Sequence, residues 1–202
     1  MGILDGVPVA VKDELDMLPF PTMVGTKFYN KKAPLKDATS VARLRSAGAL
    51  MVGKTNMHEI GIGVTGLNVH YGTTRNPHHL DHYPGGSASG SAAAVAAGLS
   101  PIALGMDGGG SIRIPASLCG VVGLKTTWGR ISSAGAAPLS WSVSTVGPIT
   151  STASDAALAY SFLAGPDPKQ LLTQNQPPVE LRDFGDANLT GVKLGKFSAW
   201  FN

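Results

Sequence analysis

Residues 6–12, Gly-Val-Pro-Val-Ala-Val-Lys, are the stretch that decides the fold. Valines alternate with small residues after an early proline, which predicts a buried strand that ends at Lys12. Apolar stretches at residues 49–53, 101–105 and 121–125 predict further strands, and helical patterns lie between the strands. This alternation predicts an α/β fold, with a mixed sheet core covered by helices on both faces.

Capping residues and glycines mark the predicted helices. The first has Asp37 or Thr39 as its cap and ends at Gly48. Ser89 or Ser91 caps an alanine-rich helix. The alanine-rich helix is predicted to end at residue 99, and residues 115–118 are predicted to form one short turn of helix. The last helix is predicted to begin at Thr152 or Ser154 and to end at Gly165.

Proline and glycine interrupt any period in residues 18–34, which predicts a loop. Residues 56–66 are short and helical at best, and residues 67–84 are predicted to form a loop that is exposed or lines a cleft. Residues 166–188 have the polar, proline-containing composition of a linker. Residues 193–197 predict the start of a new strand, so we expect the chain to stop inside a larger fold.

The composition is that of an ordinary globular domain. The chain has 202 residues, 43% of them hydrophobic, and a formal net charge of +3 that is spread along the sequence. We therefore expect one domain that does not bind nucleic acid. A single cysteine, Cys119, excludes an internal disulfide and fits an intracellular, reducing compartment.

Three polar motifs predict a hydrolase site. They are Lys12 at the end of its strand, Gly-Gly-Ser-Ala-Ser-Gly-Ser at residues 85–91, and Asp-Gly-Gly-Gly-Ser-Ile-Arg at residues 107–113. A serine hydroxyl becomes a useful nucleophile when a base takes its proton, and backbone N–H groups stabilise the oxyanion that follows. Three glycines directly before Ser111 allow such N–H groups to turn inward. Ser111 is the candidate nucleophile.

Other motifs favour plainer interpretations. Residues 61–66, Gly-Ile-Gly-Val-Thr-Gly, match a dinucleotide-binding pattern, but no clear strand precedes them. Residues 123–126 lack the adjacent Gly-Lys pair of a phosphate loop. Four histidines have irregular loop spacing and no cysteine partners, which favours surface or cleft-lining positions over a metal site: His58, His78, His79 and His82. We expect neither a cofactor nor a metal.

Taken in order, Gly-x-Pro-x-Ala-Val-Lys-Asp, Gly-Gly-Ser with its Gly/Ser/Ala-rich sequel, and Asp-x-Gly-Gly-Ser-Ile-Arg-x-Pro-Ala resemble the amidase signature family of Ser-Ser-Lys hydrolases. The resemblance covers residues 4–165. Residues 107–110, 125–130 and 194–201 are more similar to plant-type fatty acid amide hydrolases than to the subunits of tRNA-linked amidotransferases. Members usually have further segments on both sides, so we expect residues 1–202 to be an amidase signature domain truncated at both ends, poorly stable or inactive alone.

The resemblance implies a role for each polar residue. Ser111 is the acylated nucleophile, Ser87 is a bridging serine preceded by a cis peptide bond from Gly86, and Lys12 is the base. An uncharged amine at Lys12 takes the proton of Ser111 through Ser87 and returns it to the departing amine. This requires Lys12 to be neutral near pH 7, and therefore substantially buried.

The oxyanion hole is assigned to the backbone N–H groups of Gly108, Gly109, Gly110 and Ser111. We expect Arg113 to contact polar groups of the substrate or to form an ion pair with Asp107 or another carboxylate.

Two positions depart from the family pattern. Ala88 stands where a second serine is common, and Ser89 where glycine is common. The change permits a rival register in which Ser89 bridges. The spacing of 24 residues between Ser87 and Ser111 favours Ser87.

Three functions follow as expectations. The first is hydrolysis of N-acyl amines such as N-acylethanolamines through an acyl-enzyme, on a small-molecule amide substrate that can be a lipid. The second is one component of a glutamine-dependent amidotransferase that works with partner subunits. The third is a catalytically silent binding remnant of the fold. A homodimer, a cytoplasmic location and peripheral membrane contact through segments outside this chain remain open.

Overall fold

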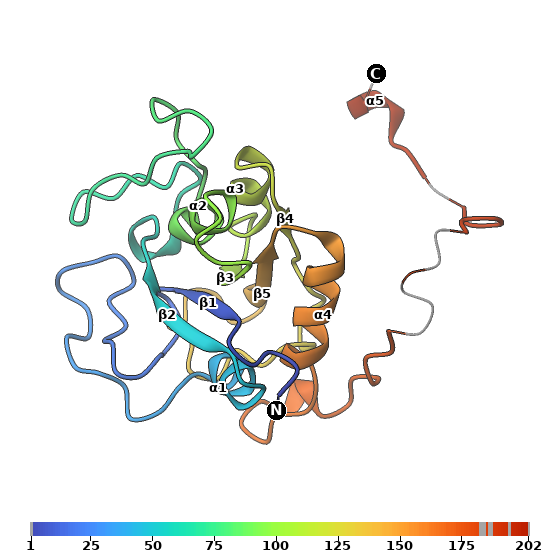
Figure 1. The fold of residues 1–202 in the computed structure, drawn as a ribbon, viewed down its shortest axis with the longest axis horizontal. Helices are drawn as coiled ribbons and strands as arrows, with labels where there is room; N and C mark the ends of the chain where they lie inside the picture. The colour runs from blue at the N-terminus through green and yellow to red at the C-terminus, as the bar shows by residue number, and fades with distance from the viewer. Residues whose placement is uncertain (1, 182–184, 186–187, 194, 202) are drawn as a thin grey trace.

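A single mixed sheet forms the centre of the protein. The computed structural model describes residues 2–181, 185, 188–193 and 195–201. Within them the strand order is β2-β1-β3-β5-β4 (Figure 1). β1 runs parallel to β2 and β3, whereas β5 runs antiparallel to β3 and β4. The strands are β1 (Pro8–Lys12), β2 (Leu50–Thr55), β3 (Ile102–Asp107), β4 (Val122–Gly123) and β5 (Thr145–Thr150).

Helices cover both faces of the sheet, as the sequence predicts (Figure 1). Successive side chains of a strand point to opposite faces, so Val9 and Val11 join one buried cluster while Ala10 joins another. The first cluster contains side chains of α1 (Thr39–Ser46) and α4 (Ala153–Leu163). The second contains side chains of α2 (Ser89–Ala96) and packs beside α3 (Arg113–Leu118). Small residues let α2 approach the sheet closely.

The sequence pattern did not predict β5. Gly147 and Pro148 lie in the middle of this strand, and both residue types are uncommon in strands. The structure requires the glycine, because a Cβ atom at position 147 would lie 2.1 Å from the Leu124 carbonyl oxygen. β5 is nevertheless fully buried between β3 and β4.

Two predicted helix caps were wrong. α1 has Ala38 as its N-cap, and the Thr39 hydroxyl instead donates to Asp167 Oδ2 over 2.7 Å. α2 has no side-chain cap either, because the Ser91 hydroxyl donates to the Leu104 carbonyl oxygen at 2.9 Å. Tertiary partners have taken the hydroxyls that a local pattern assigns to capping. The predicted cap of α4 is confirmed, since Thr152 Oγ1 accepts a hydrogen bond from the Asp155 N–H group.

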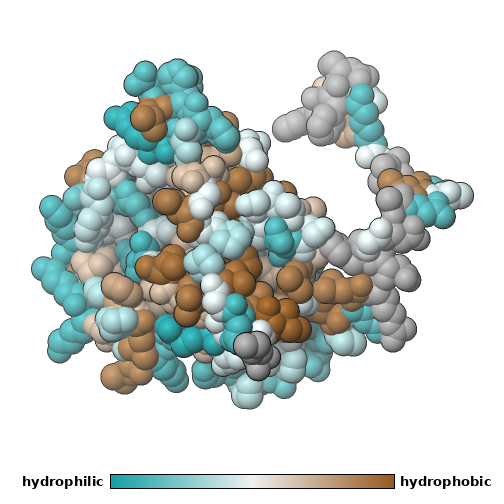
Figure 2. All heavy atoms as spheres, viewed as in Figure 1, coloured by the Kyte–Doolittle hydropathy of each residue, from teal (hydrophilic) through white to brown (hydrophobic). Residues whose placement is uncertain are grey.

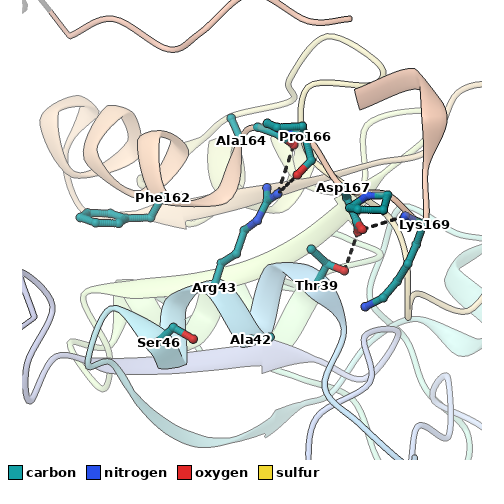
Figure 3. Close-up of a pocket in the computed structure, with 11 residues that line it drawn as sticks. Thr39, Ala42, Arg43, Ser46, Phe162, Ala164, Pro166, Asp167 and Lys169 are labelled. Carbon is teal, nitrogen blue, oxygen red and sulfur yellow. Dashed lines mark hydrogen bonds between the residues drawn. The ribbon is translucent and has the colours of Figure 1, made fainter. Parts of the chain in front are cut away.

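Residues 166–173, the first part of the predicted linker, are attached to the domain by hydrogen bonds. Asp167 is buried and accepts hydrogen bonds from Thr39 and Ser132, and a short 3-10 helix, η2 (Leu171–Thr173), follows. Arg43 of α1 points toward the same segment and donates to the carbonyl oxygens of Gly165 and Pro166 (Figure 3). These bonds fasten the segment to α1.

The remaining segments are short. η1 (Glu59–Gly61) is the helical part of residues 56–66, and α5 (Ser198–Phe201) lies near the end of the described chain. The described residues of the predicted strand at 193–197 form no strand, and Leu194 lies outside them. Residues 77–83 of the predicted loop are largely exposed, and Figure 2 shows mainly hydrophilic surface over this protruding loop.

Candidate active site

Lys12 and Ser87 meet at the end of β1, as predicted. Lys12 is completely buried, and its Nζ atom donates hydrogen bonds to Ser87 Oγ at 2.8 Å and to the Met106 carbonyl oxygen at 3.2 Å. The three residues come from β1, from the loop before α2 and from β3. Pairing of β1 with β3 therefore brings a lysine within reach of a serine 75 positions later in the chain.

The Ser87 loop is held by close backbone packing. The Gly86–Ser87 peptide bond is cis, which confirms the prediction. Position 86 needs a glycine, because a Cβ atom there would lie 2.7 Å from the Gly66 backbone nitrogen. The Ser87 side chain is fully buried, and its carbonyl oxygen accepts a hydrogen bond from the His58 N–H group. Of the two serines, Ser87 is thus the one in contact with Lys12, whereas the Ser89 hydroxyl donates weakly to the Asn56 carbonyl oxygen at 3.4 Å.

Ser111 lies beside the Ser87 loop and faces open space. The Ala88 N–H group donates to the Ser111 carbonyl oxygen at 3.0 Å, which joins the two serine loops. The Ser111 side chain is partly exposed and lines a cavity of about 350 Å³. Its hydroxyl makes no hydrogen bond with any described residue, and so none with Ser87. The structure thus joins Lys12 to Ser87 by a hydrogen bond and places Ser111 next to this pair. Within the described chain, the hydroxyls of Ser87 and Ser111 are not hydrogen-bonded to each other.

Asp107 organises the glycine loop before Ser111. Its buried carboxylate accepts hydrogen bonds from the backbone N–H groups of Gly110, Ile112 and Arg113, and from the Arg113 guanidinium, whose Nε lies 3.0 Å from Oδ2. Burial alone would raise the pKa of Asp107, but the Arg113 side chain and the three backbone amides outweigh burial and lower that pKa. Of the two roles considered for Arg113, the structure shows the ion pair.

The same network decides which amides of the glycine loop are free. The Gly110 N–H group is used by Asp107 Oδ1 at 2.7 Å. Within the described chain, the N–H groups of Gly108, Gly109 and Ser111 have no hydrogen-bond partner. Lys125, which the sequence interpretation had not linked to the site, fixes the start of this loop by donating to the Asp107 carbonyl oxygen at 2.6 Å. Three amides beside the cavity are therefore available for an anionic oxygen, and Gly110 is not among them.

Glu14 is a site residue that the sequence interpretation missed. Its Oε2 atom lies 2.6 Å from Lys12 Nζ, and both side chains are almost completely buried. The contact is an ion pair outside hydrogen-bond geometry, because Oε2 accepts no hydrogen bond among the described residues. The only hint in the sequence was that Glu14 lies two residues after Lys12. Asp13 is an acidic residue even closer to Lys12, so proximity in the sequence could not single out Glu14.

The cavity beside Ser111 is mainly apolar. Its walls come from the loop at residues 61–64, from the glycine loop and from residues 139–144. Residues 61–64 of the Gly-Ile-Gly-Val-Thr-Gly stretch thus line this cavity, and no helix begins directly after this stretch. The apolar residues that line the cavity are Ile62, Val64, Ile114, Leu139 and Val143, and Ser140 and Ser144 add hydroxyl groups.

Two further observations concern the described chain as a whole. Residues 2–181, 185, 188–193 and 195–201 contain no cluster of three or more side chains suited to holding a metal ion, and the His78 ring instead contacts the Cys119 carbonyl oxygen at 2.9 Å. Among the same residues, no helix is long and apolar enough to cross a membrane.

Known proteins are similar to this chain in sequence and in fold. A family model described as Amidase matches residues 1–198. A fatty acid amide hydrolase of Oryza sativa subsp. indica is 48% identical over 207 residues, which cover 100% of this chain and 34% of the relative. The A-type component of the glutamyl-tRNA(Gln) amidotransferase of Symbiobacterium thermophilum is 44% identical over 195 residues, which cover 96% of this chain and 40% of that relative.

The X-ray structure of the native peptide amidase from Stenotrophomonas maltophilia superposes with a TM-score of 0.84. It is 40% identical in sequence, and the match covers 91% of this chain and 38% of that chain. The present chain therefore spans about a third of the length of the first of these curated relatives.

Proposed function

Because the chain belongs to the amidase family, we propose that it carries the catalytic centre of a serine amidohydrolase. The observation that carries the proposal is the 2.8 Å hydrogen bond between Lys12 Nζ and Ser87 Oγ, both fully buried. A buried lysine in contact with a serine hydroxyl is suited to proton transfer. Ser111, next to this pair and open to a cavity, is the proposed nucleophile.

The proposed reaction has two half-reactions that use one proton route. Lys12, as a neutral amine, takes the proton of Ser87 while Ser87 takes the proton of Ser111, whose oxygen attacks the amide carbon. The proton then returns along the same path to the leaving amine, and an acyl ester remains on Ser111. Water activated by the same route attacks this ester, which releases the acid and restores the hydroxyl.

The oxyanion is proposed to lie against the free amides of Gly108, Gly109 and Ser111. Donors fixed in advance stabilise developing charge because they need no reorganisation during the reaction. Asp107 supports this arrangement by holding the Gly110 and Ile112 N–H groups, which sets the loop conformation. Removing one such donor typically costs about 10²–10³ in kcat.

Fatty acid amides are the proposed substrate class. Apolar side chains dominate the walls of the Ser111 cavity, which suits an acyl chain better than the polar side chain of glutamine. The similarity to the Oryza sativa fatty acid amide hydrolase supports the same choice. The second candidate, one component of an amidotransferase, is supported by the similarity to the Symbiobacterium thermophilum protein. Hydrolysis of N-acylethanolamines of increasing chain length, compared with hydrolysis of glutamine, separates the two.

A fluorophosphonate probe tests the catalytic assignment and the silent-remnant alternative together. We expect covalent labelling at Ser111, found by peptide mass spectrometry and lost in Ser111→Ala. The Lys12→Ala and Ser87→Ala variants should label far more slowly. Ser154→Ala, at an exposed position on α4, is the matched control and should label normally. Labelling that persists in Lys12→Ala would contradict the relay, and a folded protein that never labels would favour the binding remnant.

For the whole protein, a homodimer, a cytoplasmic location and peripheral membrane contact are also proposed from the resemblance. Sedimentation velocity tests the first and fractionation of the source cells the second. Flotation with phosphatidylcholine vesicles tests the third.

A further inference from the structure

Three oxygen atoms surround the Lys12 amine. Its Nζ atom donates to the Ser87 hydroxyl and the Met106 carbonyl oxygen and lies 2.6 Å from Glu14 Oε2. The first two oxygens belong to uncharged groups, so Glu14 supplies the one charge among these three neighbours. The ion pair with Glu14 is therefore the contact that depends on charge.

The surroundings of Glu14 suit this ion pair. Its side chain is 3% exposed, and Oε2 has no polar contact among the described residues apart from Lys12. Glu14 also lines a cavity of about 250 Å³ whose other walls are mostly apolar and include Val24, Phe28 and Leu139. Charges in such surroundings interact more strongly than charges in water, because screening is weaker.

Other charged groups near Lys12 have partners of their own. On β3, the Asp107 carboxylate is held by the hydrogen bonds described above. On β2, Lys54 pairs with Asp13 over 3.3 Å. The loop before α2 contributes an uncharged serine. Among the described residues, Glu14 is the one carboxylate within ion-pair distance of Lys12.

We propose that Glu14 is a positioning residue that holds the Lys12 amine against Ser87. This inference rests on the proposed function. The ion pair keeps the amine at the end of β1, within hydrogen-bond distance of Ser87.

The test compares Ser111 labelling by a fluorophosphonate in the wild type, Glu14→Gln and Glu14→Asp, with the maximal labelling rate measured separately from the apparent affinity for the probe. In Glu14→Gln the amine loses the charge that holds it, so the maximal rate should fall by about 10²-fold while the affinity for the probe is unchanged. Glu14→Asp keeps the charge and should recover part of that rate. A purely structural role would lower the melting temperature, and Glu14→Asp would recover none of the rate.

Nuclear magnetic resonance supplies a readout that does not need activity. The ¹⁵Nζ signal of Lys12, identified by its absence in Lys12→Met, should move in Glu14→Gln and stay near its wild-type position in Glu14→Asp. An unmoved Lys12 signal in a folded Glu14→Gln protein would overturn the proposal, as would an unchanged maximal labelling rate. A moved signal in a protein that never labels would retain the Lys12–Glu14 contact and reject the proposed function instead.

Discussion

Asp107→Asn tests how much of the fold depends on the loop before Ser111. The wild-type carboxylate accepts two hydrogen bonds at Oδ1, from the Gly110 N–H group and from Arg113 Nη2, and three at Oδ2, from the Ile112 and Arg113 N–H groups and Arg113 Nε. Asparagine replaces one oxygen with an NH₂ group. This group is itself a donor, so it cannot accept hydrogen bonds from the N–H groups that face it. The variant must therefore lose at least two of these five bonds.

Hydrogen bonds to charged groups contribute about 1.5–3 kcal/mol each, so two lost bonds correspond to about 3–6 kcal/mol. The Arg113 side chain is 52% exposed, so water replaces part of its contribution, and we expect a loss of about 3–4 kcal/mol. That is a large fraction of the roughly 5–15 kcal/mol that stabilises a typical domain.

Guanidinium unfolding followed by circular dichroism measures this loss as a change in the free energy of unfolding. Asp81→Asn is the matched control, because Asp81 is exposed and its carboxylate makes no hydrogen bond within the described chain. The control should change stability by no more than about 0.5 kcal/mol. A loss of about 1 kcal/mol or less in Asp107→Asn, the net value of one ordinary hydrogen bond, would refute the assigned network.

Three further predictions follow from local geometry. The lowered pKa of Asp107 means that its stabilisation is present above its unfolded pKa of about 3.9 and is lost as the pH falls through the folded value, so the wild type should lose more stability in acid than Asp107→Asn. Acid unfolding curves of the two proteins check this. Thr152→Ala removes the oxygen that accepts from the Asp155 N–H group, and thermal unfolding should show a loss of about 1 kcal/mol, while Ser154→Ala should show almost none. Burial raises the pKa of the Cys119 thiol to about 11, so iodoacetamide at pH 8 should leave it intact in the native protein and alkylate it rapidly in denaturant; rapid native labelling would contradict its burial.

The parts of the fold that could be predicted are those in which local pattern and tertiary structure agree. The alternating valines of β1 predicted both a buried strand and a lysine at its end, and the lysine lies there. The cis bond before Ser87 and its contact with Lys12 followed from the family resemblance. In these places the local sequence already satisfies what the fold requires.

The rest depended on contacts that no local pattern encodes. β5 was hidden because Gly147 and Pro148 are unfavourable in strands by themselves, and Gly147 is needed only because the Leu124 carbonyl oxygen comes close. Thr39 and Ser91 are typical capping residues whose hydroxyls are taken by distant partners. Likewise, the loss of the Gly110 amide from the predicted oxyanion hole depends on how the Asp107 side chain turns.

The position of the protruding loop at residues 67–84 has a consequence for the integrity of the chain. Along the sequence the loop lies between Lys12 on one side and both serines on the other, so a protease that cuts within residues 77–83 would divide the proposed catalytic groups between two peptides. Those peptides would remain joined by the backbone bonds between β1 and β3. A nicked protein can therefore keep Lys12 beside Ser87, whereas neither piece alone contains all the proposed catalytic groups.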